Sequence, residues 1–562
     1  MSSRTRSTRS RTARSLVAVA AGAAVAASVA FVATTPAAAA SGEPEPVVAT
    51  VEIEPEDSSL VRTEDGVVRG TVTDSYRSFQ GIPYAAAPVG ERRWGSPQRP
   101  EPWPGVREAT APASPCAQAG DFIGDVPSTQ EDCLYLNVTT PRDATADVKP
   151  KPVMVWIHGG GFTWGSGGIY GAERLAAQGD VVVVTFNYRL GVFGFMAHPA
   201  LDSGPAEHLS GNLGIEDQQA VLQWVRDNAA AFGGDPNNVT IFGESAGGMS
   251  GCAHLSAPGS AGLFERVIIQ SGPCTLRWQF PDTWRAKPRA QAEAQGTELA
   301  TAAGCADPAT AAECLRSKTT EELLAADGGQ HGFGPSYGGG VIPEDPARQL
   351  AAGETAEVPV MHGITRDEHV TFQAGIDTMM GPVAPADYPA VLGQYLGVDA
   401  ATADRVAREY PLSDFAGSTS WATASVLTDW GWGCPATDVN RQLSRENPTF
   451  AYEFSDRTAP WFAGPDLPAY PTGAFHAGEL QYLFSGAYAR AELSPEQQLL
   501  SDRMIGYWTQ FARTGDPNGN GLPEWPHYDE GGHVQSLAAG PEGVGGVDMD
   551  REHRCGFWRS VS

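Results

Sequence analysis

The sequence predicts an α/β fold, in which a large, mostly parallel, twisted central sheet is flanked by helices, with helical insertions over one end of the sheet. Two observations support this. Apolar runs at residues 151–157 and 181–186 are continuous, which is typical of strands buried on both faces of a parallel sheet. Residues 217–232 carry apolar side chains at helical spacing. With neither an internal repeat nor a linker, the chain predicts one large domain over residues 61–562.

The first forty residues differ from the rest of the chain. Five arginines precede an Ala/Val-rich run at residues 16–32, and small residues follow at 37–40. This order is that of a secretory signal peptide, so we expect residues 1–40 to be removed by cleavage near Ala40. A signal anchor is the alternative, because about 18 apolar residues can just span a bilayer. Residues 41–60 are rich in Pro and Glu, which predicts a flexible N-terminus.

Composition excludes several classes of protein. Hydrophobic residues make up 41% of the 562 positions, with 14 Trp and 21 Phe, so the chain has ample material for a core. Removal of residues 1–40 would take away five Arg and no acidic residue, which moves the formal net charge from −28 to −33. Such a charge keeps an exported protein soluble and argues against nucleic acid and anionic membranes as partners.

Eight cysteines in an exported chain predict disulfide bonds. None of them stands in a C-x-x-C or a Cys/His spacing, so we expect no zinc site. No cofactor motif is present either. The sequence therefore predicts a protein that works without a metal or a cofactor.

The remaining elements follow in order along the chain. An Asp-Gly turn lies between two β-prone runs and predicts a hairpin, and the Pro- and Gly-rich segment after it predicts an ordered loop. Apolar runs further on predict strands, separated by two long helical segments. The hairpin is expected at 63–72, the strands at 264–270, 358–364 and 448–454, and the helical segments at 278–353 and 384–445.

The pentapeptide at residues 243–247, Gly-Glu-Ser-Ala-Gly, has the setting of a catalytic serine. It follows the β-prone residues 239–241, and a strand that turns sharply into a helix can expose a serine at the turn. The neighbours two positions away must be small, and Gly243 and Gly247 meet that need. The pentapeptide predicts that Ser245 is a nucleophile.

A serine nucleophile needs donors for an oxyanion, an acid and a base. His158 and the three glycines after it end a strand, leaving backbone N–H groups that could face a carbonyl oxygen; a glycine-rich turn without a ligand is the alternative. The N–H of Ala246 is expected to be a further donor. We expect His158 itself to be structural.

The acid and the base should follow the serine in that order. Asp367 and Glu368 both stand where the strand at 358–364 gives way to a loop, and the residues alone do not choose between them. Most of the eleven histidines can be discounted by position, because those before the acid break the order and three lie near the C-terminus. His476 is therefore the predicted base.

Several motifs resemble the type-B carboxylesterase and cholinesterase family, which has the α/β-hydrolase fold. They are FQGIPYA at 79–85, EDCLYLN at 131–137, the glycine triplet and the pentapeptide. The resemblance implies Glu368 as the acid and Gly160, Gly161 and Ala246 as the oxyanion hole. It also implies that Glu244 lies near the catalytic histidine, and we expect Ser271 as its partner.

This chain departs from the family pattern at three positions. Thr365 replaces an Asn and His369 replaces a Gly beside the acid, which leaves Asp367 as a rival. Gly338 stands where the family usually carries Asp.

The resemblance also implies three disulfides, Cys116–Cys133, Cys305–Cys314 and Cys434–Cys555. Cys252 and Cys274 remain. One follows the start of the helix after Ser245 and the other follows the next strand, so these two could meet and form a fourth pair.

The predicted function is that of a secreted serine hydrolase, favoured as a monomer, that cleaves small carboxylic esters through an acyl-enzyme. A lipase or polyester hydrolase is the alternative, and a non-catalytic cholinesterase-like binding domain is disfavoured because Ser245, Glu368 and His476 are all present. Residues 117–132 contain no Trp, which disfavours a choline esterase. Phe162, Trp164 and Tyr170 are expected to line or flank the entrance to the site, suggesting apolar or aromatic esters.

Overall fold

The computed structural model describes residues 57–561 apart from 121–126, 147, 203–208, 278–284, 330–331, 463–466, 490 and 530. The predicted signal peptide, and the predicted flexible segment as far as residue 56, lie outside the described residues. In the part of the chain that is described, no helix is long and apolar enough to cross a bilayer.

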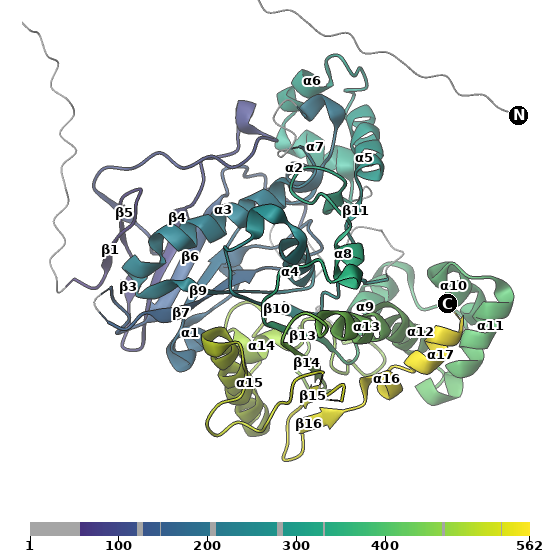
Figure 1. Cartoon of the computed structure of the whole chain (residues 1–562). Coiled ribbons are helices and arrows are strands. Elements are labelled where there is room, and N and C mark those ends of the chain that lie inside the picture. The colour runs from purple at the N-terminus through teal and green to yellow at the C-terminus, as the bar shows by residue number, and fades with distance from the viewer. Residues whose placement is uncertain are drawn as a thin grey trace, which may run out of the picture. The chain divides into compact units, whose positions relative to one another are not determined.

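An eleven-stranded sheet forms the centre of the fold (Figure 1). Its order is β16-β15-β14-β13-β10-β9-β7-β8-β6-β4-β3; the stretch from β15 to β8 is parallel and the outer pairs are antiparallel. The mostly parallel sheet predicted from the sequence is confirmed. The strands are β3 (Thr71–Val72), β4 (Tyr76–Pro83), β6 (Tyr135–Pro141), β7 (Lys151–Ile157), β8 (Val182–Phe186), β9 (Gly234–Glu244), β10 (Arg266–Gln270), β13 (Val360–Thr365), β14 (Thr449–Phe454), β15 (Val534–Leu537) and β16 (Val544–Val547).

Both faces of the sheet are covered, which explains the continuous apolar runs. Along β7, Val153, Val155 and Ile157 join the cluster under α3 (Leu213–Asn228) and α4 (Ala246–Ser256). Met154 and Trp156 join the cluster under α1 (Glu173–Gly179) and α15 (Pro495–Thr514). Since successive side chains of a strand point to opposite faces, every position of β7 from Val153 to Ile157 is apolar.

Two runs of helices leave the sheet after β10 and after β13, in agreement with the two predicted helical segments. The first run consists of α5 (Arg289–Ala302), α6 (Ala311–Ser317), α7 (Thr320–Asp327) and α8 (Pro346–Ala352). The second run consists of α9 (Val370–Met380), α10 (Tyr388–Leu396), α11 (Ala400–Glu409), α12 (Thr419–Thr428), a π-helical turn (Asp429–Gly433) and α13 (Cys434–Leu443).

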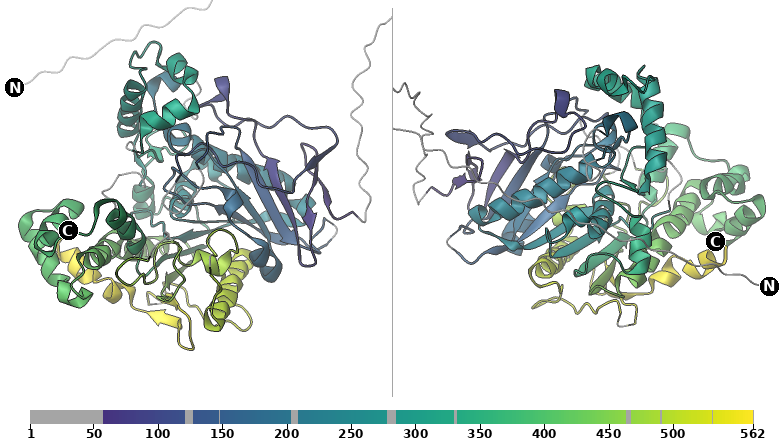
Figure 2. Two further views of the ribbon diagram at one scale, coloured as in Figure 1. Left: turned by 180° about the vertical axis from the view of Figure 1, so that it is seen from behind. Right: turned by 45° about the horizontal axis from the view of Figure 1, so that its top comes forward.

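The C-terminal helices return to the second run. α17 (Cys555–Val561) shares a small apolar core with α10, α11 and α12, to which Trp558 contributes. Figures 1 and 2 show α16 and α17, in yellow, beside these green helices in every view.

Short elements complete the fold. A small sheet pairs β1 (Leu60–Arg62), β2 (Val67–Arg69) and β5 (Val106–Glu108), in which β1 and β2 form the predicted Asp-Gly hairpin, and β11 (Lys287–Pro288) pairs with β12 (Ser336–Tyr337). The short helices are α2 (Gly191–Phe195), α14 (Leu480–Leu483) and α16 (Met549–Glu552), with 3₁₀ turns at Gly90–Arg92, Gly167–Ile169, Pro199–Leu201, Ala229–Phe232, Pro258–Ser260, Pro385–Asp387 and Leu412–Phe415.

The predicted boundaries need small corrections. The strand expected from residue 358 begins at Val360, because Pro359 has no N–H to donate to a neighbouring strand. The helix expected at 217–232 begins earlier, at Leu213, and its last turn is a 3₁₀ helix from Ala229. Helix ends often tighten in this way.

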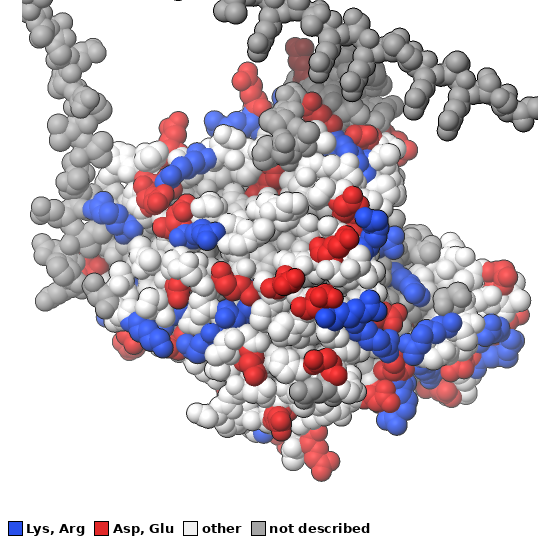
Figure 3. Space-filling model, viewed as in Figure 1, with Lys and Arg blue, Asp and Glu red and all other residues white. Residues whose placement is uncertain are grey.

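All eight cysteines form the four expected pairs, Cys116–Cys133, Cys252–Cys274, Cys305–Cys314 and Cys434–Cys555. The first three close loops of 9 to 22 residues, and the fourth joins positions 121 residues apart. On the face seen in Figure 3, acidic and basic side chains are interspersed, so the acidic excess does not gather there into one patch.

Candidate active site

Ser245 stands at the turn between β9 and α4. Its backbone has φ 57° and ψ −121°, a strained conformation for a residue with a side chain. A Cβ atom at Gly243 would lie 2.6 Å from the carbonyl carbon of Gly247, and one at Gly247 would lie 1.9 Å from the carbonyl oxygen of Ile157. The two glycines therefore provide the room that the sequence predicted.

The glycine triplet lies beside this serine. A Cβ atom at Gly159 would be 3.2 Å from Cβ of Ser245, so the loop after β7 contacts the turn that carries Ser245. Within the described ranges, the backbone N–H groups of Gly160, Gly161 and Ala246 donate to no other residue. Three unused donors next to one serine can stabilise an oxyanion.

His158 contacts the glycine loop that follows it, in agreement with the structural role expected of this residue. Its Nδ1 lies 2.8 Å from the carbonyl oxygen of Gly159, and its ring stacks on Tyr188 with centroids 4.3 Å apart. Burial lowers the pKa of His158 to about 4, so its ring is neutral at physiological pH.

His476 lies between two carboxylates. Its Nδ1 is 2.5 Å from Oε2 of Glu368, and its Nε2 is 3.0 Å from Oε1 of Glu244. No hydrogen bond joins Ser245 Oγ to His476 among the described residues, which is common before substrate binds. Because Glu244 precedes Ser245 in the chain, its contact with Nε2 places the imidazole next to the turn that carries Ser245.

Glu368, not Asp367, is the carboxylate that contacts His476. Glu368 is fully buried and also accepts a hydrogen bond from the N–H of Thr365 at 2.9 Å. Asp367 forms a two-fold ion pair with Arg457, at 2.7 and 2.9 Å, and accepts from the N–H of Ala474. Its charge is therefore neutralised away from the imidazole.

A third carboxyl group, Glu479, completes the cluster, and sequence reasoning gave it no role. Burial, followed by the charges of Glu244 and Glu368, raises the pKa of Glu479 to about 8. Gln270 donates to its Oε1 at 3.1 Å. Glu479 is thus mostly protonated at neutral pH, which limits the negative charge buried around His476.

The pKa values of His476 and Glu244 shift in the same direction. Burial alone would lower the pKa of His476, but Glu244 and Glu368 raise it well above its usual value. Burial raises the pKa of Glu244, and the imidazole partly offsets this effect.

The expected bond between Ser271 and Glu244 is not formed. Within the described residues, Oγ of Ser271 has no hydrogen-bond partner, whereas its N–H donates to the carbonyl oxygen of Gly363 at 2.8 Å. The serine backbone has φ 47°, at the point where the chain leaves β10. Sequence proximity to the site indicated the neighbourhood of Ser271 but not its side-chain direction.

Two of the three aromatic residues expected at the entrance are buried in the core. Phe162 is fully buried against Phe195, and Tyr170 packs in the core against Trp156, so the expectation was wrong for both; Trp164 is half-buried.

Phe372 and Trp432 instead contact the imidazole of His476, with ring centroids 4.9 and 5.0 Å away. Phe372 lies on α9, one helical turn after Glu368, and this spacing could have indicated it. Nothing in the sequence near Trp432 points to the site.

The structure also shows the surroundings of His369 and Gly338, two residues that depart from the family pattern. His369 is buried. Burial, followed by the charge of His476, lowers the pKa of His369 to about 3, so its ring is neutral. Its backbone N–H donates to Thr428 Oγ1 at 2.9 Å. Gly338 has φ +107°, a backbone conformation that residues with side chains rarely adopt.

Comparison with known proteins agrees with this geometry. The model of the carboxylesterase family matches residues 57–558. Para-nitrobenzyl esterase of Bacillus subtilis (strain 168) is 37% identical over 487 residues, which cover 84% of this chain and 93% of that protein. Pyrethroid hydrolase Ces2e of Rattus norvegicus is 35% identical over 499 residues, covering 84% and 85%.

A solved structure of PNB esterase superposes with a TM-score of 0.72 at 34% identity, covering 88% of this chain and 99% of that chain. The fold is therefore that of an α/β-hydrolase, and the relatives support the hydrolysis of carboxylic esters. By the family match and these relatives, the chain belongs to the carboxylesterase family and is a carboxylic ester hydrolase.

Proposed function

We propose that the chain is a secreted serine esterase, in which Ser245 is the nucleophile, His476 the base and Glu368 the acid that orients it. The observation that carries this proposal is the position of His476: its Nδ1 contacts Glu368, while Nε2 contacts the residue that precedes Ser245. An imidazole held at Nδ1 by a carboxylate has the tautomer that a base acting through Nε2 requires.

In the first half of the reaction, the neutral imidazole takes the proton of Ser245 as Oγ attacks the ester carbonyl. The resulting oxyanion accepts hydrogen bonds from the N–H groups of Gly160, Gly161 and Ala246. The imidazolium then gives its proton to the leaving alcohol, and an acyl-enzyme remains.

In the second half, water replaces the alcohol and His476 acts again as base. Glu368 stabilises the imidazolium in both halves. Loss of one oxyanion donor costs on the order of 2.7–4 kcal/mol in sites of this kind. Because Glu244 and Glu368 raise the pKa of His476, the imidazolium must lose a proton before His476 can act as a base.

Labelling with a fluorophosphonate tests this assignment. The wild type should be labelled and should hydrolyse a para-nitrobenzyl ester, a probe suggested by the name of the Bacillus relative. Ser245→Ala should lose both properties, whereas Ser256→Ala, at the other end of α4, should keep them. Labelling that persists in the Ser245→Ala variant would refute the nucleophile, and a folded wild type without labelling would favour a binding domain.

Secretion is the second part of the proposal. Four disulfides suit an oxidising compartment, and the predicted signal peptide supplies the export route. The product in the culture medium should begin near residue 41 when its N-terminus is sequenced. A product that keeps Met1, or that stays with the cells, would contradict secretion.

A lipase or polyester hydrolase is the second candidate. Met379 and Met380, which end α9, are 79% and 81% exposed, and α9 begins two residues after Glu368. Exposed apolar side chains of this kind suit an insoluble substrate. Activity on esters of increasing acyl length distinguishes an esterase from a lipase, since an esterase loses activity on the long chains and a lipase does not.

A further inference from the structure

The imidazole of His476 is held on its ring as well as at its nitrogens. Trp432 and Phe372 approach it at 54° and 48°, and their own rings are nearly parallel at 9°. Trp432 is fully buried. Aromatic faces next to an imidazole restrict its rotation and favour its charged form.

Trp432 comes from the π-helical turn Asp429–Gly433, between α12 and α13. Such turns are rare and often occur at functional sites. A Cβ atom at Gly433 would overlap the imidazole of His553, 2.3 Å from Cγ, so the ring of His553 lies directly against the turn. The π-helical turn that carries Trp432 therefore packs against the C-terminal segment.

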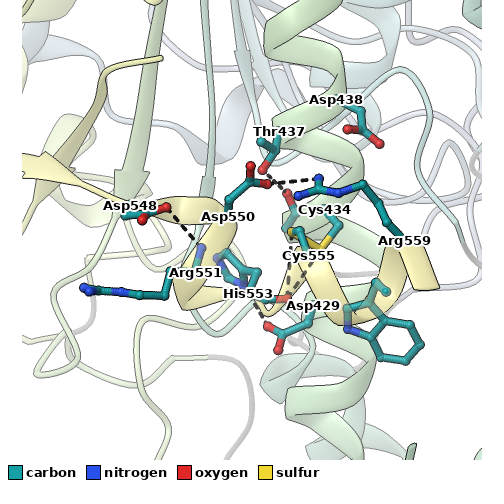
Figure 4. The surroundings of a disulfide bond; sticks show 12 residues. Asp429, Cys434, Thr437, Asp438, Asp548, Asp550, Arg551, His553, Cys555 and Arg559 are labelled. Atoms are coloured by element: carbon teal, nitrogen blue, oxygen red, sulfur yellow. Dashed lines mark hydrogen bonds and ion pairs between the residues drawn. A yellow bond between two sulfur atoms is a disulfide. The ribbon is translucent and has the colours of Figure 1, made fainter. Parts of the chain in front are cut away.

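The same segment holds both ends of the turn (Figure 4). At its start, Asp429 Oδ1 lies 2.7 Å from Nδ1 of His553, and Asp429 Oδ2 accepts from Tyr410 at 2.6 Å. Directly after the turn, Cys434 is bonded to Cys555.

His553 also ties the turn to the sheet. Its Nε2 lies 3.0 Å from Oε1 of Glu453, a fully buried residue of β14. Burial alone would lower the pKa of His553, but Asp429 and Glu453 raise it to about 10. The ring therefore stays charged at neutral pH and satisfies both carboxylates.

We propose that Trp432 is a positioning residue for His476, and that His553 and the Cys434–Cys555 bond hold Trp432 in place by fixing the two ends of its π-helical turn. This inference rests on the proposed role of His476 as the base.

The test replaces Trp432 and compares it with an equally buried tryptophan. Trp432→Leu should lower kcat about thirtyfold, the equivalent of one desolvated cation–π contact, with KM nearly unchanged. It should also move the acid limb of the kcat/KM profile to lower pH, because the imidazolium loses a stabilising face. Trp432→Phe should restore most of the loss. Trp525→Leu, in the other core cluster, should change thermal stability but neither kcat nor the pH profile.

A double-mutant cycle tests the contribution of the C-terminal segment. His553→Gln should lower kcat in the same direction, and the losses of His553→Gln and Trp432→Leu should not add, because one acts through the other. Additive losses would overturn the link to the C-terminal segment. If Trp432→Leu affected only stability, Trp432 would be a core residue and the positioning role would be wrong.

If Trp432→Leu fails to fold, Trp432→Phe and Trp432→His decide the question together. The role of the aromatic face is supported if Trp432→Phe keeps full kcat and an unmoved pH profile while Trp432→His has a moved profile. Unchanged profiles in both variants overturn it. Failure of the catalytic assignment is distinguishable, since it would appear as persistent activity in His476→Ala, whatever Trp432 does.

Discussion

Glu479 makes the stability of this protein depend on pH. Its carboxyl group is fully buried, and its pKa is about 8 against an ordinary value of 4.5. Because the pKa is raised in the folded state, the folded protein binds this proton more tightly than the unfolded chain does. The stabilising contribution of this proton is therefore fully present below about pH 4.5, and it is lost as the pH rises through 8.

Replacement of Glu479 by Gln removes this dependence. The rise from 4.5 to about 8 corresponds to a linkage free energy on the order of 5 kcal/mol. With an unfolding entropy of roughly 2.1 cal/mol/K per residue over about 500 residues, this equals about 5 °C in Tm. A glutamine keeps an oxygen that can accept the bond from Gln270, so the variant should lose no contact.

Thermal unfolding at a fixed scan rate, from pH 5 to pH 9, checks the prediction. The wild type and Glu479→Gln should have the same Tm at pH 5, and the Tm of the variant should be about 5 °C higher than that of the wild type at pH 9. Glu492→Gln, at an exposed position, serves as the matched control and should follow the wild type throughout. Curves for Glu479→Gln that also follow the wild type at pH 9 would refute the reasoning.

Three further predictions concern the site and its support. Glu244→Gln should move the acid limb of the kcat/KM profile to lower pH, because a carboxylate that raises the pKa of the imidazole is removed; a profile unchanged in pH would contradict this. Gly247→Ala should abolish folded enzyme in an expression assay, since its Cβ would overlap a carbonyl oxygen at 1.9 Å, whereas Gly375→Ala, with open space around it, should be tolerated. Loss of Cys252–Cys274, which closes 22 residues, should lower the unfolding free energy by about 3 kcal/mol in denaturant titrations, and an unchanged midpoint would count against it.

The sheet could be predicted from the sequence because its signal is local. Residues 153–157 are apolar at successive positions, which is typical of a strand covered on both faces. Boundaries depended on hydrogen bonding as well, as the strand that starts after Pro359 illustrates. Neither the strand order nor the π-helical turn has a comparable local pattern.

The site was predictable where a residue type has a fixed place in a motif. Ser245 and the glycine loop follow from the strand that precedes each of them, whereas the choice of Glu368 over Asp367 needed the resemblance. Side-chain contacts across the fold were not predictable. Trp432 contacts His476 through tertiary packing alone, and Oγ of Ser271 has no hydrogen-bond partner among the described residues, so the expected bond to Glu244 is not formed.

The Cys434–Cys555 bond also sets an order of events during biosynthesis. Cys555 belongs to the last helix of the chain, and its partner lies 121 residues earlier. The bond cannot close until residue 555 has been synthesised and the two thiols have been oxidised. A chain that ends before residue 555 therefore lacks the covalent link that directly follows the turn carrying Trp432.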